Sequence, residues 1–170
     1  MNDLAELLMI EHSAIRHISK YININNEDDL LGFHEYLKSV HIELEEKVLF
    51  PVLISNLDLD SKDLVSLIDQ LKVDHKSIDD LAKEISTLWE KEDNGTATDK
   101  TKLYFRLLKD HNNSEDSSVF LLWNNVGEKE KATAMKEAGN IIDSFWRKLY
   151  IDLMGLPPDA YHYLTATPKK

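Results

Sequence analysis

The sequence predicts an all-α protein, an up-down-up-down four-helix bundle with an additional C-terminal helix. Helix-breaking residues are scarce, because the chain has five glycines and four prolines and three of those prolines lie at or after Pro157. Apolar residues recur at the 3.6-residue helical period, and clusters of turn-forming residues interrupt that period in four places. Long helices joined by short turns are typical of a bundle.

The first two predicted helices form a hairpin. One covers about residues 1–23 and stops in the asparagine-rich segment 23–26. The next starts near Asp28 and has a ragged end around residues 56–60. Within it Pro51 predicts a kink or an early end, because proline lacks an amide hydrogen and its ring clashes with the preceding turn.

Three further helices complete the prediction. The third begins after Ser61, which can act as its N-cap, and ends near Trp89. The fourth runs from near Asp99 to Trp123, and the fifth covers about residues 128–154. The spacing of these helices predicts a second hairpin, with the fifth helix alongside it or at one end.

We expect one domain, residues 1–155, with the bundle core at 4–125 and a polar tail at 156–170. A chain of 170 residues buries enough surface to fold without covalent staples. The net charge of −11 opposes binding to nucleic acid or anionic lipid. The acidic start of the chain and the lack of a long apolar run predict a cytoplasmic protein with no membrane segment. With no cysteine, any metal site must use His, Asp and Glu.

A repeated pattern is the most informative feature of the chain. Glu11-His12-Ser13-Ala14-Ile15 recurs as Asp74-His75-Lys76-Ser77-Ile78. A His-x-x-x-Glu pair follows each of these segments, and the two pairs are His41 with Glu45 and His111 with Glu115. Residues four apart share one face of a helix, so each pair presents an imidazole and a carboxylate to one point.

The four histidines should share one level of the bundle and face its axis. In antiparallel helices, two residues lie at one height when the turn is halfway between them, and all three midpoints between successive histidines fall in predicted turns. A leucine lies four residues before each histidine, as expected on a core-facing stripe. Two buried carboxylates would be costly without metal ions, and imidazole with carboxylate admits iron, manganese, zinc or mixed pairs.

The ordered set of motifs resembles the hemerythrin-like, or HHE cation-binding, family over about residues 4–125. It consists of a lone His, a His-x-x-x-Glu-Glu-x-x-Leu-Phe-Pro segment from His41 to Pro51, a second lone His and a second His-x-x-x-Glu. The resemblance implies a non-haem di-iron centre, two iron ions with an oxo or hydroxo bridge. It implies these metal ligands: bridging Glu45 and Glu115, with terminal His12, His41, His75 and His111.

Two residues are possible additional ligands. Oxygen-carrying hemerythrins have a second His one turn after the lone His of the third helix, and this chain has Asp79 there. One metal ion should therefore have an open position or gain Asp79 as a ligand. His34 lies on the His41 stripe but ~10 Å away along the axis, so it reaches the same ion only if the helix is distorted; the alternative is that it lines an access path. Glu46 and Asp116, each following a proposed ligand, should be solvated or contact the ligands from outside.

The resemblance implies a pocket for a small diatomic or peroxide ligand. The leading hypothesis is a redox-active centre that binds dioxygen, nitric oxide or peroxide and reduces or senses it. The alternatives are reversible oxygen binding or iron handling, and a metal- or oxygen-responsive interaction module without turnover. The lost histidine at position 79 counts against oxygen carriage. The sequence identifies neither a catalytic residue nor the protein electron donor or partner.

Overall fold

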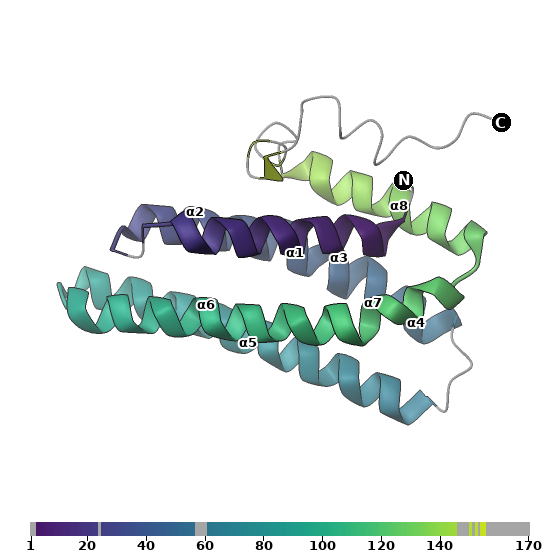
Figure 1. Cartoon of the computed structure of the whole chain (residues 1–170), viewed down its shortest axis with the longest axis horizontal. Helices are drawn as coiled ribbons and strands as arrows, with labels where there is room; N and C mark the ends of the chain where they lie inside the picture. Colours follow the sequence, from purple (N-terminus) through teal and green to yellow (C-terminus); the bar gives the residue numbers. More distant parts are fainter. Residues whose placement is uncertain are drawn as a thin grey trace.

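The computed structural model describes residues 3–23, 25–56, 61–145, 150, 152, 154 and 155, and helix is the regular secondary structure throughout them. The long helical segments lie side by side as a bundle, with a further helix on the outside (Figure 1). The chain is therefore all-α, as predicted. None of the helices in the described residues is long and apolar enough to cross a bilayer.

The first segment is α1, Leu4–Tyr21. Asp3 caps it, because the Asp3 carboxylate accepts hydrogen bonds from the backbone amides of Ala5 and Glu6. The helix stops at Ile22, whose backbone is extended. The prediction of one helix over about residues 1–23 is confirmed for its described part.

The second segment is continuous but irregular. It consists of α2 (Glu27–Tyr36), the π-helical turn η1 (Leu37–His41), α3 (Ile42–Leu44), a second π-helical turn η2 (Glu45–Leu49) and α4 (Phe50–Asn56). The helical segment continues past Pro51 to Asn56, where its predicted ragged end begins, so of the two effects predicted for Pro51 the early end does not occur. Pro51 follows a turn whose amides already bond five residues back, as Phe50 does to Glu45, so the missing proline amide falls where the α-helical ladder is already interrupted.

The second hairpin consists of α5 (Ser61–Glu90) and α6 (Asn94–Ser117). The predicted start of the fourth helix near Asp99 is wrong, because the Asp93 side chain caps α6 by accepting from the Thr96 amide. The chain reverses just before, at Glu92, with a positive φ of 60°. Turn-forming residues therefore make the cap and first turn of α6 rather than a long loop.

The fourth helix also ends earlier than predicted. Ser118, with φ −130° and ψ −71°, separates α6 from the short α7 (Val119–Leu122), which leads into the 3-10 turn η3 (Trp123–Asn125). The last helix is α8, Glu128–Ser144. Most of its predicted continuation to residue 154, and the predicted tail at 156–170, lie outside the described residues.

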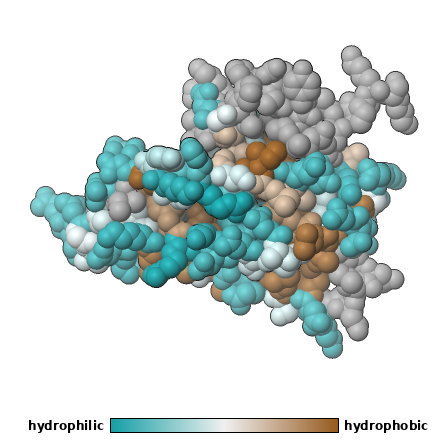
Figure 2. Space-filling view, viewed as in Figure 1, coloured by the Kyte–Doolittle hydropathy of each residue, from teal (hydrophilic) through white to brown (hydrophobic). Residues whose placement is uncertain are grey.

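The core is a continuous apolar cluster between the helices. Its largest fully buried side chains include Trp123, Tyr36, Tyr104, Tyr150 and Phe50. Helix α8 contacts α1 and the second segment, and it buries a stripe of small and apolar residues against them. Much of the face drawn in Figure 2 is hydrophilic, with apolar residues gathered mainly toward the right of the view. Among the described residues, ten polar or charged ones are buried in this otherwise apolar interior, and six of these form the site described next.

Candidate metal centre

The π-helical turns lie at the first two candidate ligands of the second segment. His41 is the last residue of η1, and Glu45 is the first residue of η2. Such turns widen the helix and are frequent at functional sites. By contrast, His111 and Glu115 lie on the regular helix α6. Neither π-helical turn was predicted, because hydrophobic periodicity does not separate α from π over one turn.

The six predicted ligands come together in two groups that each could hold a metal ion. In each group the ligand atoms lie within 4.8 Å of one another, and all of the residues are buried. The groups share both carboxylates, those of Glu45 and Glu115. The first group is completed by His12 and His41, and the second by His75 and His111.

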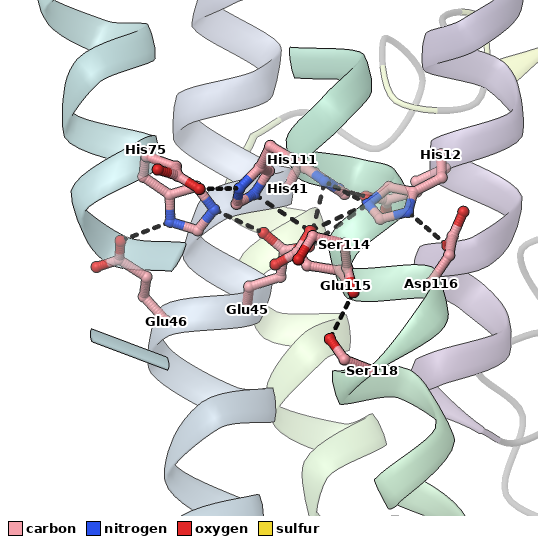
Figure 3. A network of polar contacts seen from close by, with 12 residues as sticks. His12, His41, Glu45, Glu46, His75, His111, Ser114, Glu115, Asp116 and Ser118 are labelled. Carbon is pink, nitrogen blue, oxygen red and sulfur yellow. Dashed lines mark hydrogen bonds and ion pairs between the residues drawn. The ribbon is translucent and has the colours of Figure 1, made fainter. Parts of the chain in front are cut away.

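The imidazoles point their Nε2 atoms toward the shared carboxylates (Figure 3). The Nε2 atoms of His41 and His75 each lie 3.2 Å from an oxygen of Glu45. The same distance separates Nε2 of His111 from Glu115, and His12 lies 3.5 Å from Glu115 and 3.7 Å from Glu45. Each carboxylate therefore faces imidazoles of both groups, which is the geometry a bridging ligand requires.

The buried oxygens of this cluster lack hydrogen-bond donors of their own. Both carboxylate oxygens of Glu45 and of Glu115 are buried without a hydrogen-bond partner among the described residues, as are Nε2 of His75 and Nε2 of His111. Leaving such groups unpaired costs several kcal/mol. Imidazole nitrogen with carboxylate oxygen is a donor set that suits first-row transition metals. The chemistry of the six side chains therefore fits a pair of metal ions.

The outward nitrogen of each histidine faces a carboxylate. Nδ1 of His12 lies 2.8 Å from Asp116, and Nδ1 of His75 lies 2.8 Å from Glu46 (Figure 3). The other two pairs are His41 with Glu11 at 2.7 Å and His111 with Asp74 at 3.6 Å. A proton on Nδ1 that is donated to a carboxylate leaves the Nε2 lone pair free for a metal.

These outer carboxylates form a closed circuit around the bundle. Each carboxylate contacts the histidine of a neighbouring segment: Glu11 of α1 contacts the second segment, Glu46 of η2 contacts α5, Asp74 of α5 contacts α6, and Asp116 of α6 contacts α1. Every one of them is adjacent in sequence to a candidate ligand. Glu46 and Asp116 were predicted as possible outer contacts, and Glu11 and Asp74 were missed. The repeated acidic residue before each lone histidine was the signal that could have identified them.

Glu11 links the site to the C-terminal part of the chain. One Glu11 oxygen accepts from His41, and the other accepts a hydrogen bond of 2.8 Å from the Tyr150 hydroxyl. Glu11, His41 and Tyr150 are all buried. Burial and the nearby Glu11 raise the pKa of Tyr36, whose hydroxyl donates to the Met154 sulfur.

In the absence of metal, the carboxylates favour protonated imidazoles. Burial by itself would lower the pKa of His75, but the neighbouring carboxylates of Glu45 and Glu46 outweigh it and raise the pKa to about 10. The pKa of His12 is raised in the same way, against burial, by Asp116, Glu115 and Glu45. Burial would raise the pKa of Glu45, yet the surrounding imidazoles lower it. In the metal-free protein the imidazoles of His12 and His75 therefore carry protons that a metal ion would displace.

The two possible additional ligands, Asp79 and His34, lie outside both groups. Nε2 of His34 lies 3.1 Å from Asp79, and its Nδ1 lies 3.0 Å from the Tyr104 hydroxyl. Asp79 also contacts Lys38 at 3.2 Å and Lys83 at 2.5 Å. These residues therefore form a network of their own at a different level of the bundle.

The comparison with known families agrees with the geometry. The model of the hemerythrin HHE cation-binding domain matches residues 3–123, which covers most of the chain and all six clustered side chains. Comparisons with curated proteins and with solved structures gave no match. With its four-helix core and its two His and Glu groups inside the matched segment, the chain belongs to the hemerythrin HHE cation-binding domain family.

Proposed function

We propose that this protein holds two iron ions, bridged by Glu45 and Glu115, and uses them to bind a small molecule that it reduces or senses. The observation that supports the proposal is the sharing of two buried carboxylates by two histidine pairs. A carboxylate that belongs to both groups can bind one ion with each of its oxygens. Two such carboxylates therefore suit a pair of ions. The terminal ligands are then His12 and His41 for one ion and His75 and His111 for the other.

The charge around the site supports a metal that reaches high oxidation states. Among the described residues, two inner carboxylates and four outer ones surround the pair, six in total, and the guanidinium of Arg16 contacts one of them, Asp116. Six negative charges match two trivalent ions, and they would stabilise the oxidised state more than the divalent one. This balance favours iron or manganese over zinc, which has no redox chemistry.

The donor count supports a reactive centre. Each group supplies four donor residues, fewer than the six donors of an octahedral ion, so a small molecule can bind beside them. A bound iron pair would supply the electrons for reducing dioxygen, nitric oxide or peroxide. The protein holds the imidazoles of His12, His41 and His75 by hydrogen bonds at Nδ1, and it excludes water with the apolar layers above and below. Asp79 points toward His34, so it adds no fifth protein donor.

A second candidate function is a metal-responsive interaction module. The contact of Tyr150 with Glu11, and of Glu11 with His41, favours it, because Tyr150 lies outside the segment that matches the family model. Metal binding to His41 would then be coupled to the position of the C-terminal segment. Reversible oxygen carriage has less support, since the position of the additional histidine of oxygen carriers is an aspartate turned away from the site.

Metal analysis with spectroscopy tests the proposal. Protein purified anaerobically should contain about two irons per chain, as expected for a bundle with paired carboxylates. Oxidation should produce a charge-transfer absorption of the iron pair, and dioxygen, nitric oxide and peroxide should be added separately to find the one that reacts. Protein that stays free of metal under ample iron supply, or that takes up zinc alone, would contradict the proposal.

Matched variants test the ligands. We expect His41→Ala and Glu115→Ala to lose metal, because each removes a donor from the cluster. His17→Ala is the control: His17 lies on the same helix as His12 but is exposed, and its loss should leave the metal content unchanged. A full metal complement in His41→Ala would show that the ligand set is wrong.

A further inference from the structure

Tyr104, His34 and Asp79 have no part in the proposed metal site, yet they form a continuous chain of hydrogen bonds from a phenol through an imidazole to a carboxylate. Tyr104 lies on α6, has no exposed surface and is packed by Phe33 and Phe105. Its hydroxyl is 3.0 Å from Nδ1 of His34. The phenol therefore has a base as its hydrogen-bond partner inside an aromatic, water-poor environment.

The protonation states of the three groups follow from their surroundings. Burial lowers the pKa of His34, although Asp79 partly offsets this, so the imidazole is neutral near pH 7. Burial would raise the pKa of Asp79, but Lys83, His34 and Lys38 hold it far below its usual value. His34 therefore donates a hydrogen bond from Nε2 to the Asp79 carboxylate, and its Nδ1 accepts a hydrogen bond from the Tyr104 hydroxyl.

This arrangement suits the loss of one electron from Tyr104. Burial, and then the charge of Asp79, raise the pKa of Tyr104, so the phenolate does not form near neutral pH. An oxidised phenol is a strong acid and must release its proton to a neighbouring base. His34 is within reach of that proton, and Asp79 stabilises the imidazolium that results.

The distance to the metal site allows an electron to pass but not a proton. Tyr104 and His111 lie seven residues apart on α6, which is ~10 Å along the axis. The buried apolar side chains of Leu108 and Leu37 occupy the intervening turns of their helices. A proton needs an unbroken chain of hydrogen bonds, whereas an electron tunnels across such a distance through packed side chains.

We propose that Tyr104 is a redox-active tyrosine that gives one electron to an oxidised metal ion in the neighbouring site while its phenolic proton moves to Nδ1 of His34. The O–H bond breaks, a neutral phenoxyl radical and an imidazolium form, and the oxidant, a metal ion oxidised by dioxygen or peroxide, is reduced by one unit. The electron transfer rests on the proposed metal function. The oxidation of Tyr104 with His34 as base does not.

Photo-oxidation of the metal-free full chain tests the tyrosine. Illumination with tris(bipyridine)ruthenium and persulfate, followed by freezing and electron paramagnetic resonance, should show a tyrosyl radical that persists. Tyr104→Phe should lose this signal. The control Tyr21→Phe, which removes a 75% exposed tyrosine, should retain it. An unchanged persistent signal in Tyr104→Phe would overturn the proposal.

Two variants test the role of the base. Glutamine at position 34 can still hydrogen-bond to Tyr104 but cannot take its proton, so His34→Gln should lower the radical yield by about tenfold or more. Asp79→Asn should give an intermediate yield, because the amide keeps the hydrogen bond but not the charge. Circular dichroism melting should show that both variants fold. A wild-type yield in folded His34→Gln would overturn the assignment of His34.

Iron-loaded protein tests the link to the metal site. Peroxide added to the loaded wild type should produce the same radical signal, and Tyr104→Phe should lack it while it retains its iron. A radical that forms by photo-oxidation but never with peroxide would overturn electron donation to the metal. A chain that binds no iron would instead contradict the proposed function, and the metal-free experiment would still decide the chemistry of Tyr104 and His34.

Discussion

The two halves of the bundle carry the same His and Glu pattern on different backbones. In the first half, π-helical turns end at His41 and begin at Glu45, whereas in the second half His111 and Glu115 lie on one regular helix. A π-helical turn rotates the side chains that follow it relative to an α-helix. His-x-x-x-Glu spacing therefore identifies the residues of the site, but it does not determine the helix geometry that sets the direction of their side chains.

The support behind the histidines differs in the same way. In the first half, His41 bonds at 2.7 Å to Glu11, which has no exposed surface and also accepts from Tyr150. In the second half, Asp74 lies 3.6 Å from His111, and its side chain is 38% exposed. A charge contact is stronger where water is excluded. His41 should therefore be held more firmly than His111.

The largest expected effect is the loss of both ions on removal of a shared carboxylate. Glu45→Gln removes the charge with almost no change of shape, and Glu45 belongs to both groups. We expect metal analysis to find neither ion, whereas His111→Ala, which alters only the second group, should keep part of the metal. Equal metal contents in the two variants would contradict the shared role of Glu45.

The next effect compares Glu11, the carboxylate behind His41, with Asp74, the carboxylate behind His111. Glu11→Gln should weaken metal binding by about 10–100-fold, the range typical of carboxylates that hold a ligand histidine. Asp74→Asn should weaken it much less, because that contact is longer and partly exposed. Competition with a chelator of known affinity measures both. If Asp74→Asn proved the more damaging variant, the ranking of the two halves would be reversed.

Metal binding should depend on pH through the imidazoles. The pKa of His75 in the metal-free chain is about 10, above its ordinary value of 6.5, so this proton stabilises the metal-free fold below about pH 6.5 and its contribution is lost as the pH rises through about 10. A metal ion must displace that proton, so the apparent affinity should rise with pH toward about 10. Calorimetry near pH 7 in buffers of different ionisation enthalpy should detect proton release. Binding without proton release would contradict a protonated His75.

The smallest expected effect concerns the C-terminal contact. Tyr150→Phe removes one hydrogen bond to buried Glu11 and should lower the free energy of unfolding by about 1–3 kcal/mol. Urea denaturation measures this change. Tyr21→Phe, at an exposed position, should leave the free energy of unfolding almost unaltered. A metal affinity that also falls in Tyr150→Phe would sharpen the comparison, since it would show that the support of His41 extends to residue 150.

Much of the site followed from local pattern. The repeat brought out His12, His41, Glu45, His75, His111 and Glu115, and the structure groups these six. The helical class followed from the scarcity of proline and glycine and from the apolar period. Helix ends were harder to predict, because Asp93 caps α6 within a segment that resembles a turn, and Ser118 ends α6 within an otherwise continuous apolar period.

The sequence by itself determined which side chains gather in the two candidate metal groups and that they share one level, because helical spacing is a local property of the chain. Only the tertiary structure decided which carboxylate supports which histidine, and that Asp79 turns to His34 rather than to the metal groups. Those pairings join residues that are far apart in sequence, such as His12 with Asp116. Their partners are selected by how the helices pack and rotate against one another, which no local period encodes.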